Sequence, residues 1–201
     1  DMMEACSMVS PTFLVNVVVN DDQQVIAAFA GNWITAHRAA CDLVDRMYGV
    51  PAKEKTPLVI ASAGGFPKDL NFYQTIKTLS NALEVVDEGG TIILVTRSQE
   101  GFGNGDTQRQ IAGFATMVER EKDLRENFSI GAFIGYLFAE SAEKYHMIVV
   151  TGMEQADFGT SKIHVVKTLD QALALSRELN GGKDLRATLM PHGANTLPKF
   201  A

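Results

Sequence analysis

Hydrophobic positions divide the chain into two parts with different patterns. In the first part, FLVNVVVN (residues 13–20) and QVIAAFAG (residues 24–31) are rich in β-branched residues and are joined by polar residues 20–23. This pattern predicts a β-hairpin. Residues 35–49 then carry apolar side chains at helical spacing and end in glycine, which predicts an amphipathic helix. Its apolar face comprises Ala36, Ala39, Ala40, Leu43, Val44 and Met47.

The second part alternates apolar runs with amphipathic helices. The apolar runs occupy residues 57–62, 91–96, 147–152, 162–167 and 186–191, and the intervening helices are expected at residues 71–86, 106–120, 131–145 and 168–179. Apolar strands without alternation are typical of a parallel sheet that is covered on both faces. The pattern therefore predicts an α/β fold, with a ligand crevice beyond the carboxyl ends of its strands.

The stretch GVPAKEKTP (residues 49–57) separates the two parts. It contains two prolines and three charged residues and has no periodic pattern, so we expect a domain boundary there. The predicted organisation is residues 1–50 in one domain, a linker at 51–57 and an α/β domain at 58–201. The chain opens with DMMEACSMVS, without methionine at position 1 and with helical apolar spacing, which indicates a piece of a longer protein.

Composition narrows the classes of function. Hydrophobic residues make up 46% and charged residues 21% of the 201 residues, as in soluble globular proteins. The net charge of −6 argues against a nucleic-acid surface, which needs a basic patch. No signal peptide is evident and no apolar run approaches the ~18 residues of a membrane span. Two cysteines without framework spacing are typical of a reducing, cytoplasmic setting.

The richest stretch for chemistry is SAGGFPKDLNFYQTIKTL, residues 62–79, at the carboxyl end of the first predicted strand of the sheet. On the helix that follows, Tyr73 and Lys77 are four residues apart and Gln74 and Lys77 three apart, so the three side chains can share one edge. A phenol, an amide and a cation together suit a small carboxylate or a phosphate. From the pattern alone the favoured alternative is a packed tyrosine, a solvated glutamine and a surface lysine.

Other candidate features are weaker. SQEGFGNGD (residues 98–106) does not satisfy GxGxxG and predicts a mobile loop that could close over a site. The four histidines have no metal-ligand spacing, so no self-contained metal site is expected. Among them, His192 lies in a turn-rich segment and is expected to be a turn or interface residue. Phe133 lies near the start of a predicted helix, where it could face a crevice.

The segment SAGGFPKDLNFYQTIKTLSNALEVVDEGGTIILVTRSQEGFG, residues 62–103, resembles the C-terminal domain of the nickel-dependent lactate racemase family. The motifs SAGGxPKDxNxYQxxK, GGTIILV and EGxG carry this resemblance. FLVNVVVN, AHRAAC and DRMYGVP resemble the end of the family's catalytic domain, and MPHGANTLP resembles its chain terminus. Essentially the whole chain is covered.

The resemblance implies a racemase or epimerase of small 2-hydroxy acids that uses a nickel-pincer nucleotide, a nickel-holding cofactor tethered to a lysine. In that family the cofactor accepts a hydride from C2 of the substrate while a histidine takes the hydroxyl proton. Lys77 and Gln74 match positions that contact the substrate, and Tyr73 and Phe133 match positions on the cofactor side. The family usually has tryptophan at the last position, and phenylalanine lacks its N–H donor.

The same resemblance implies a partner, the N-terminal catalytic domain of the same protein. None of the four histidines here matches the family's nickel ligand or its catalytic histidines, and the tethering lysine is also unmatched. The chain alone is therefore expected neither to hold the cofactor covalently nor to racemise a substrate.

Three alternatives stay open from the sequence. The substrate could be a 2-hydroxy acid other than lactate. The chain could be a non-catalytic small-molecule-binding domain that lost its active half. It could also be a nucleotide-binding α/β domain that uses the glycines of residues 101–105.

Overall fold

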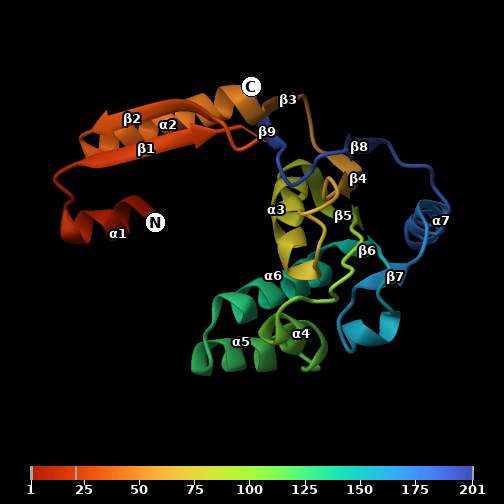
Figure 1. Cartoon of the computed structure of the whole chain (residues 1–201). Helices are drawn as coiled ribbons and strands as arrows, with labels where there is room; N and C mark the ends of the chain where they lie inside the picture. Colours follow the sequence, from red (N-terminus) through yellow and green to blue (C-terminus); the bar gives the residue numbers. More distant parts are fainter. Residues whose placement is uncertain (1, 21, 201) are drawn as a thin grey trace. The chain divides into compact units, whose positions relative to one another are not determined.

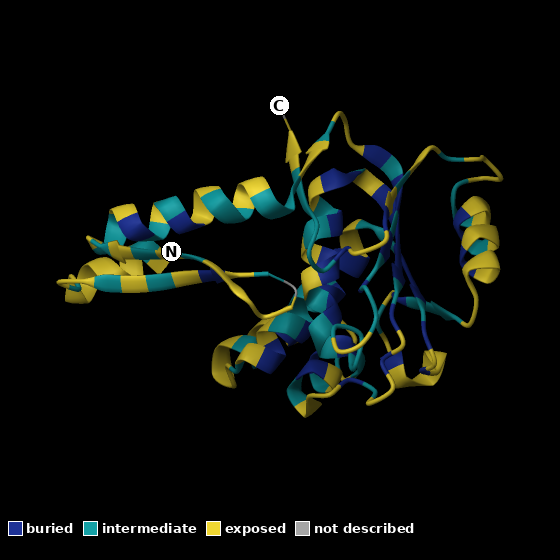
Figure 2. Cartoon of the chain, turned by 45° about the horizontal axis from the view of Figure 1, so that its top comes forward, coloured by how far each residue is buried: buried dark blue, intermediate teal, exposed yellow. Residues whose placement is uncertain are grey.

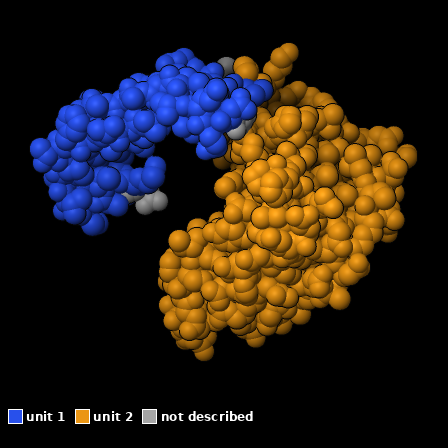
Figure 3. Space-filling model, viewed as in Figure 1, with its two compact units in different colours: residues 1–50 blue, residues 51–201 orange. Residues whose placement is uncertain are grey.

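The computed structural model describes residues 2–20 and 22–200, which form two compact units, Asp1–Val50 and Pro51–Ala201 (Figure 3). Unit 1 contains α1 (Met2–Val9), β1 (Leu14–Val19), β2 (Val25–Gly31) and α2 (Trp33–Tyr48) (Figure 1). The predicted hairpin is present, because β1 and β2 pair antiparallel from Leu14↔Gly31 to Val19↔Val25. The Asn32 side chain caps α2 by accepting hydrogen bonds from the backbone N–H groups of Ile34 and Thr35.

The two faces of the hairpin differ in burial. α2 packs against both strands and buries Ala36 and Ala40, while Val18 is the buried residue of β1. On the alternate positions of β1, Val15, Val17 and Val19 are exposed, as are Ala28 and Ala30 on β2 (Figure 2). Since side chains alternate across a strand, these residues share one apolar face that no described residue of unit 1 covers.

Unit 2 is built on a five-stranded sheet in the order β7-β6-β5-β4-β8. Its strands are β4 (Thr56–Ser62), β5 (Val86–Val95), β6 (His146–Val150), β7 (His164–Val166) and β8 (Ala187–Met190). Every neighbouring pair is parallel. All five carboxyl ends therefore lie at one edge, and the predicted α/β class with a parallel sheet is confirmed.

Helices cover the sheet on both faces (Figure 1). On one face, Val59, Ile92 and Met147 pack in the larger core with α3 (Ile76–Val85) and α6 (Ile130–Lys144). On the other, Leu58, Ile93 and Ile148 pack with Ala172, Leu175 and Leu179 of α7 (Leu169–Leu179). Adjacent residues of each strand thus enter opposite cores, which explains the apolar runs without alternation.

The region predicted as a single helix at residues 106–120 is two helices, α4 (Gly105–Ala112) and α5 (Met117–Glu126). Gly113 ends α4 by donating its N–H to the Arg109 carbonyl at 2.8 Å. A capping box between Thr116 and Glu119 then starts α5. The pattern of polar and apolar residues continues through residues 113–116, so it did not predict the interruption between α4 and α5.

Most of the stretch expected as a linker lies in strands. β3 (Gly49–Ala52) pairs with β9 (Leu197–Phe200) in a separate two-stranded sheet, and β4 begins at Thr56. Within the part of the chain that the structure describes, no helix combines the length and apolar character needed to cross a bilayer.

Candidate functional site

The Tyr73–Gln74–Lys77 segment follows the loop that leaves the carboxyl end of β4. A short 3-10 helix, η1 (Phe72–Thr75), leads directly into α3. Asn71 caps η1, because its Oδ1 accepts a hydrogen bond from the Gln74 N–H at 3.2 Å. The 3-10 turn brings residues three apart closer to alignment than an α-helix does. Gln74 lies on this 3-10 turn, and Lys77, three residues later, lies in the first turn of α3.

Phe72 anchors η1 in the larger core. Its ring is fully buried and contacts Phe138 and Phe158, with ring centroids 4.4 and 5.0 Å apart, and it meets Phe102 edge-on at 5.7 Å. Aromatic pairs at these separations add to the stabilisation gained by burial. The buried Phe72 fixes the backbone from which the neighbouring Tyr73 and Gln74 project.

The loop after β5 is joined to the same segment. The N–H groups of Phe72 and Tyr73 donate to the carbonyls of Gly101 and Phe102 at 2.9 and 3.2 Å. In the other direction, the N–H groups of Ser98 and Glu100 donate to the carbonyls of Asp69 and Leu70 at 2.8 and 3.1 Å. Together with the burial of Phe102, these four bonds make the loop a support of η1, and its mobility stays a prediction.

The predicted site residues differ in exposure. Tyr73 and Gln74 are half-buried on η1, and Lys77 is exposed one turn further on α3. Lys77 has no hydrogen-bond or ion-pair partner among the described residues, so its ammonium is available to a ligand.

Phe133 lies in the second turn of α6, and its side chain is 43% exposed. Two close approaches connect the start of this helix to η1. A Cβ built on Gly103 would lie 2.6 Å from the Asn71 Cβ, and a Cβ built on Gly131 would lie 2.6 Å from the Asn104 Cγ. The structure thus links the elements that carry Tyr73 and Phe133, while no hydrogen bond or ring contact joins the two side chains in the described residues.

The MPHGANTLP segment near the C-terminus (residues 190–198) contacts the turn with Gly64 and Gly65 that follows β4. The Gly193 N–H donates to the Ser62 carbonyl at 2.7 Å, and Asn81 donates its side-chain amide to the Gly193 carbonyl at 2.7 Å. His192 is exposed, and its Nδ1 lies 3.5 Å from the position of a Cβ on Gly64. This contact has no signal in the sequence, because residues about 130 positions apart adjoin only in the folded chain.

Some contacts near the site were not predicted from the sequence. The Asn71 amide donates to the Glu100 carboxylate at 3.4 Å and so links η1 to the loop after β5. Asp69 and Arg97 line a crevice at the carboxyl ends of the strands. The position of Arg97 just after a predicted strand was the one available signal for it.

No group of three or more histidine, cysteine, aspartate or glutamate side chains that could hold a metal occurs in residues 2–20 and 22–200. His37 and Cys41 on α2 form a pair, with the His37 Nε2 3.6 Å from the Cys41 Sγ. The arrangement around η1 can bind and orient an anionic small molecule and offers no metal ligands of its own.

Comparison with known proteins gives consistent matches. A family model described as the lactate racemase C-terminal domain matches residues 51–197. The chain is 30% identical to a lactate racemase of Lactiplantibacillus plantarum over 99% of its length, and 34% identical to a lactate racemase of Thermoanaerobacterium thermosaccharolyticum over 61%. These alignments cover 48% and 27% of the relatives, so the chain spans at most about half their length.

Solved structures show the same fold. The lactate racemase apoprotein of T. thermosaccharolyticum superposes with a TM-score of 0.85 at 24% identity, covering 99% of this chain and 48% of that one. A crystal structure of a Thermotoga maritima protein superposes with a TM-score of 0.60 at 14% identity, over 94% of this chain and 49% of that one.

Proposed function

Because the chain belongs to the lactate racemase family, we propose that it supplies the substrate-orienting part of a racemase or epimerase of small 2-hydroxy acids. The observation that carries the proposal is Lys77, exposed one turn beyond Gln74 and without a partner among the described residues. Both residues stand on a backbone held by Asn71, the buried Phe72 and the loop after β5. Such rigidity is what substrate positioning requires.

The proposed roles follow from the chemistry of the side chains. The Lys77 ammonium would pair with the substrate carboxylate, and the Gln74 amide would donate a hydrogen bond to the same group or to the 2-hydroxyl. Charge-assisted hydrogen bonds are about twice as strong as neutral ones, and they strengthen further when water is excluded. Fixing the carboxylate leaves C2 in a defined orientation, which a racemase needs because both faces of that carbon must react.

The metal of the cofactor does not fit the residues described here. The nickel-pincer nucleotide that the family resemblance implies would supply hydride transfer, but the described residues contain no ligand set for a metal. We therefore assign its nickel to other parts of the protein. Tyr73, half-buried, and Phe133, exposed, would offer aromatic surfaces to its organic part.

The partner in this proposal is the remainder of the catalytic domain in the same polypeptide. The curated relatives are at least twice as long as the matched region, and unit 1 leaves Val15, Val17 and Val19 of β1 exposed. A contiguous apolar face of this kind usually marks a contact surface.

Cys6 and Cys41 are both free of disulfides, which supports a reducing compartment, and we place the protein in the cytoplasm.

The test is Lys77→Ala in the full-length protein loaded with its cofactor. Loss of a charge-assisted contact in a closed site costs about 2–4 kcal/mol, so kcat/KM for the 2-hydroxy acid should fall by about 10²-fold or more. Lys77→Arg keeps the cation and should recover part of the loss.

Lys122→Ala is the matched control, because Lys122 is also exposed but lies on α5. It should leave kcat/KM unchanged, and both alanine variants should keep the wild-type melting temperature. Near wild-type kinetics for Lys77→Ala would remove Lys77 from the site. Absence of racemase activity in the loaded wild-type enzyme with every 2-hydroxy acid tried would contradict the proposed function itself.

A further inference from the structure

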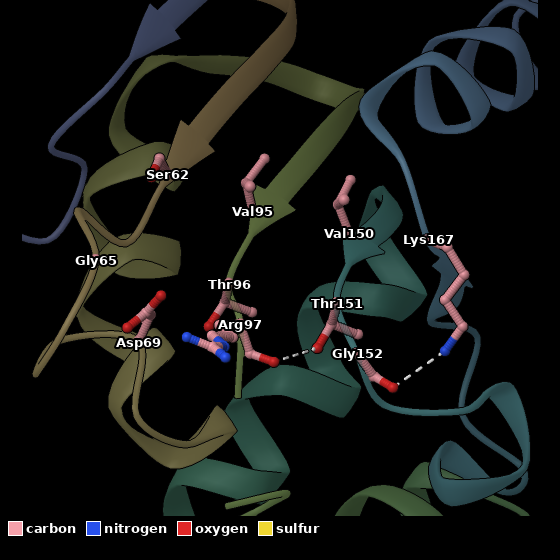
Figure 4. A pocket seen from close by; sticks show the side chains of 10 residues that line it. All are labelled: Ser62, Gly65, Asp69, Val95, Thr96, Arg97, Val150, Thr151, Gly152 and Lys167. Atoms are coloured by element: carbon pink, nitrogen blue, oxygen red, sulfur yellow. Dashed lines mark hydrogen bonds between the residues drawn. The ribbon is translucent and has the colours of Figure 1, made fainter. Parts of the chain in front are cut away.

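A crevice of about 450 Å³ lies at the carboxyl ends of β4 to β7 (Figure 4). Its apolar floor is formed by Val95 and Val150, the last residues of β5 and β6. Around this floor stand Asp69, Arg97 and Thr151. In parallel α/β sheets this edge is where ligands bind, and the volume is in the range of small-molecule sites.

One corner of the crevice places a carboxylate and a guanidinium together. The Ser98 N–H donates to the Asp69 carbonyl at 2.8 Å, which holds the backbones beside Asp69 and Arg97 next to each other. Ser98 is 3% exposed, has a left-handed backbone (φ 48°) and bonds through its hydroxyl to the Thr96 hydroxyl at 3.1 Å. A non-glycine residue kept in that conformation is costly and often occurs at functional sites.

The Asp69 and Arg97 side chains form no hydrogen bond or ion pair with the described residues. Figure 4 shows Asp69 and Arg97 directed toward one another, yet no ion pair within 4 Å joins them. Neither side chain has a hydrogen-bond partner among the residues that the structure describes. A cation and an acceptor are thus presented together, on a fixed backbone, at the mouth of an apolar crevice.

On the opposite wall of the crevice, the polar side chains of Lys167 and Thr151 already form hydrogen bonds within the protein. The Lys167 Nζ donates to the carbonyls of Gly152 and Met153 and pairs with the Glu154 carboxylate at 2.9 Å. The Thr151 hydroxyl donates to the Arg97 carbonyl at 3.2 Å and accepts from the Met153 N–H at 3.3 Å. These groups shape the wall and fix the Arg97 backbone, so ligand contacts fall mainly to Asp69 and Arg97.

From this geometry we infer that the crevice binds a phosphorylated sugar. Arg97 offers a planar set of donors that matches a phosphate group, and Asp69 offers acceptors for sugar hydroxyls. The valine floor accommodates the apolar face of the sugar. A bare inorganic anion would leave Asp69 unused, and a neutral polyol would leave Arg97 unused. A small 2-hydroxy acid would fill only part of the volume, so the inference does not rest on the proposed racemase function.

The test is calorimetric titration of the 201-residue chain with ribose 5-phosphate, ribose, inorganic phosphate, AMP and lactate. Ribose 5-phosphate should bind at least about tenfold more tightly than ribose or inorganic phosphate, because only it engages both groups. AMP binding more tightly than ribose 5-phosphate would assign the site to nucleotides, and the reverse order would assign it to free sugar phosphates. Equal or weaker binding of ribose 5-phosphate compared with phosphate would overturn the inference.

Single substitutions identify the site. Arg97→Gln and Asp69→Asn should each weaken ribose 5-phosphate binding at least about tenfold. The circular dichroism spectrum should not change, since neither side chain bonds to a residue in 2–20 or 22–200. Arg125→Gln on α5 is the control and should bind as wild type. Lys77→Ala should also bind as wild type, so failure of the proposed racemase site and failure of this site are distinguishable. Unchanged binding in both Arg97→Gln and Asp69→Asn would place the ligand elsewhere.

Discussion

At the residue scale, Arg120 of α5 is the buried charge on which the packing of unit 2 depends. It is 2% exposed, and its guanidinium donates to the carbonyls of Gln110 and Ile111 at 2.7 and 3.0 Å and to the Thr160 hydroxyl at 3.3 Å. Burial lowers the pKa of Arg120, an effect that the negative charges of Glu143 and Glu119 oppose. The guanidinium therefore satisfies carbonyls at the end of α4 that no helical N–H reaches.

Arg120→Met should destabilise the chain by about 2–4 kcal/mol, because it leaves buried carbonyls without donors. Urea unfolding followed by circular dichroism measures the change. Arg125→Met removes an arginine from the same helix, but the Arg125 side chain is 76% exposed and pairs with the exposed Glu121, so about 0.5 kcal/mol or less is expected. Equal losses in the two variants would show that the buried bonds of Arg120 contribute nothing specific.

The residue scale also marks what the sequence could predict. Tyr73, Gln74 and Lys77 could be grouped because helical spacing is a local property. The hydrogen bond from Asn71 to Glu100 and the contacts of Arg120 could not be found in this way. Their partners, Glu100 and Thr160, are 29 and 40 residues away, and only the folded chain brings them together.

At the element scale, the contact between η1 and the loop after β5 depends on the absence of a side chain at Gly103. A Cβ there would lie 2.6 Å from the Asn71 Cβ, far inside ordinary contact distance, and the backbone is left-handed (φ 69°). Gly103→Ala should therefore lower the melting temperature. It should also disturb the exchange protection of the Phe72 and Tyr73 amides, which bond to the loop.

Gly101→Ala separates the steric clash with Asn71 from the conformational cost of a left-handed backbone, the two causes of the destabilisation expected at Gly103. Gly101 has a similar φ of 62°, but nothing lies within 4 Å of its Cβ position, so it incurs only the left-handed cost of about 1–2 kcal/mol. Gly103→Ala should cost about 1 kcal/mol or more beyond this, and that excess should shrink in an Asn71→Gly background. An equal loss at both glycines would mean that the contact with Asn71 is not tight.

Elements with a strong pattern were predictable from the sequence, and those set by packing were not. β4, β6, α6 and α7 lie within a residue or two of the expected ranges, because their apolar positions reflect burial on the two faces of the sheet. β5 starts at Val86 rather than residue 91 because pairing of Thr56 with Val86 extends it. The short strands β3 and β9 form by pairing across the length of the chain, which has no local signal.

At the scale of the whole molecule, the open hairpin face of unit 1 predicts different behaviour for the isolated chain and the full-length protein. Val15, Val17 and Val19 are 66%, 48% and 38% exposed and adjoin Ala28 and Ala30. In the isolated chain this face should cause self-association, because exposed apolar surface is removed from water on contact. Val17→Lys should reduce that association, measured by sedimentation velocity.

In the full-length protein the same substitution should have the opposite consequence. If the remainder of the catalytic domain covers this face, Val17→Lys buries a charge without a partner and should lower stability by about 2 kcal/mol or more. Val118→Lys is the control, because Val118 is 77% exposed on α5, and it should change neither association nor stability. A full-length protein that tolerates Val17→Lys as well as Val118→Lys would show that the hairpin face stays open to solvent. The proposed partner would then have to bind unit 1 through another surface.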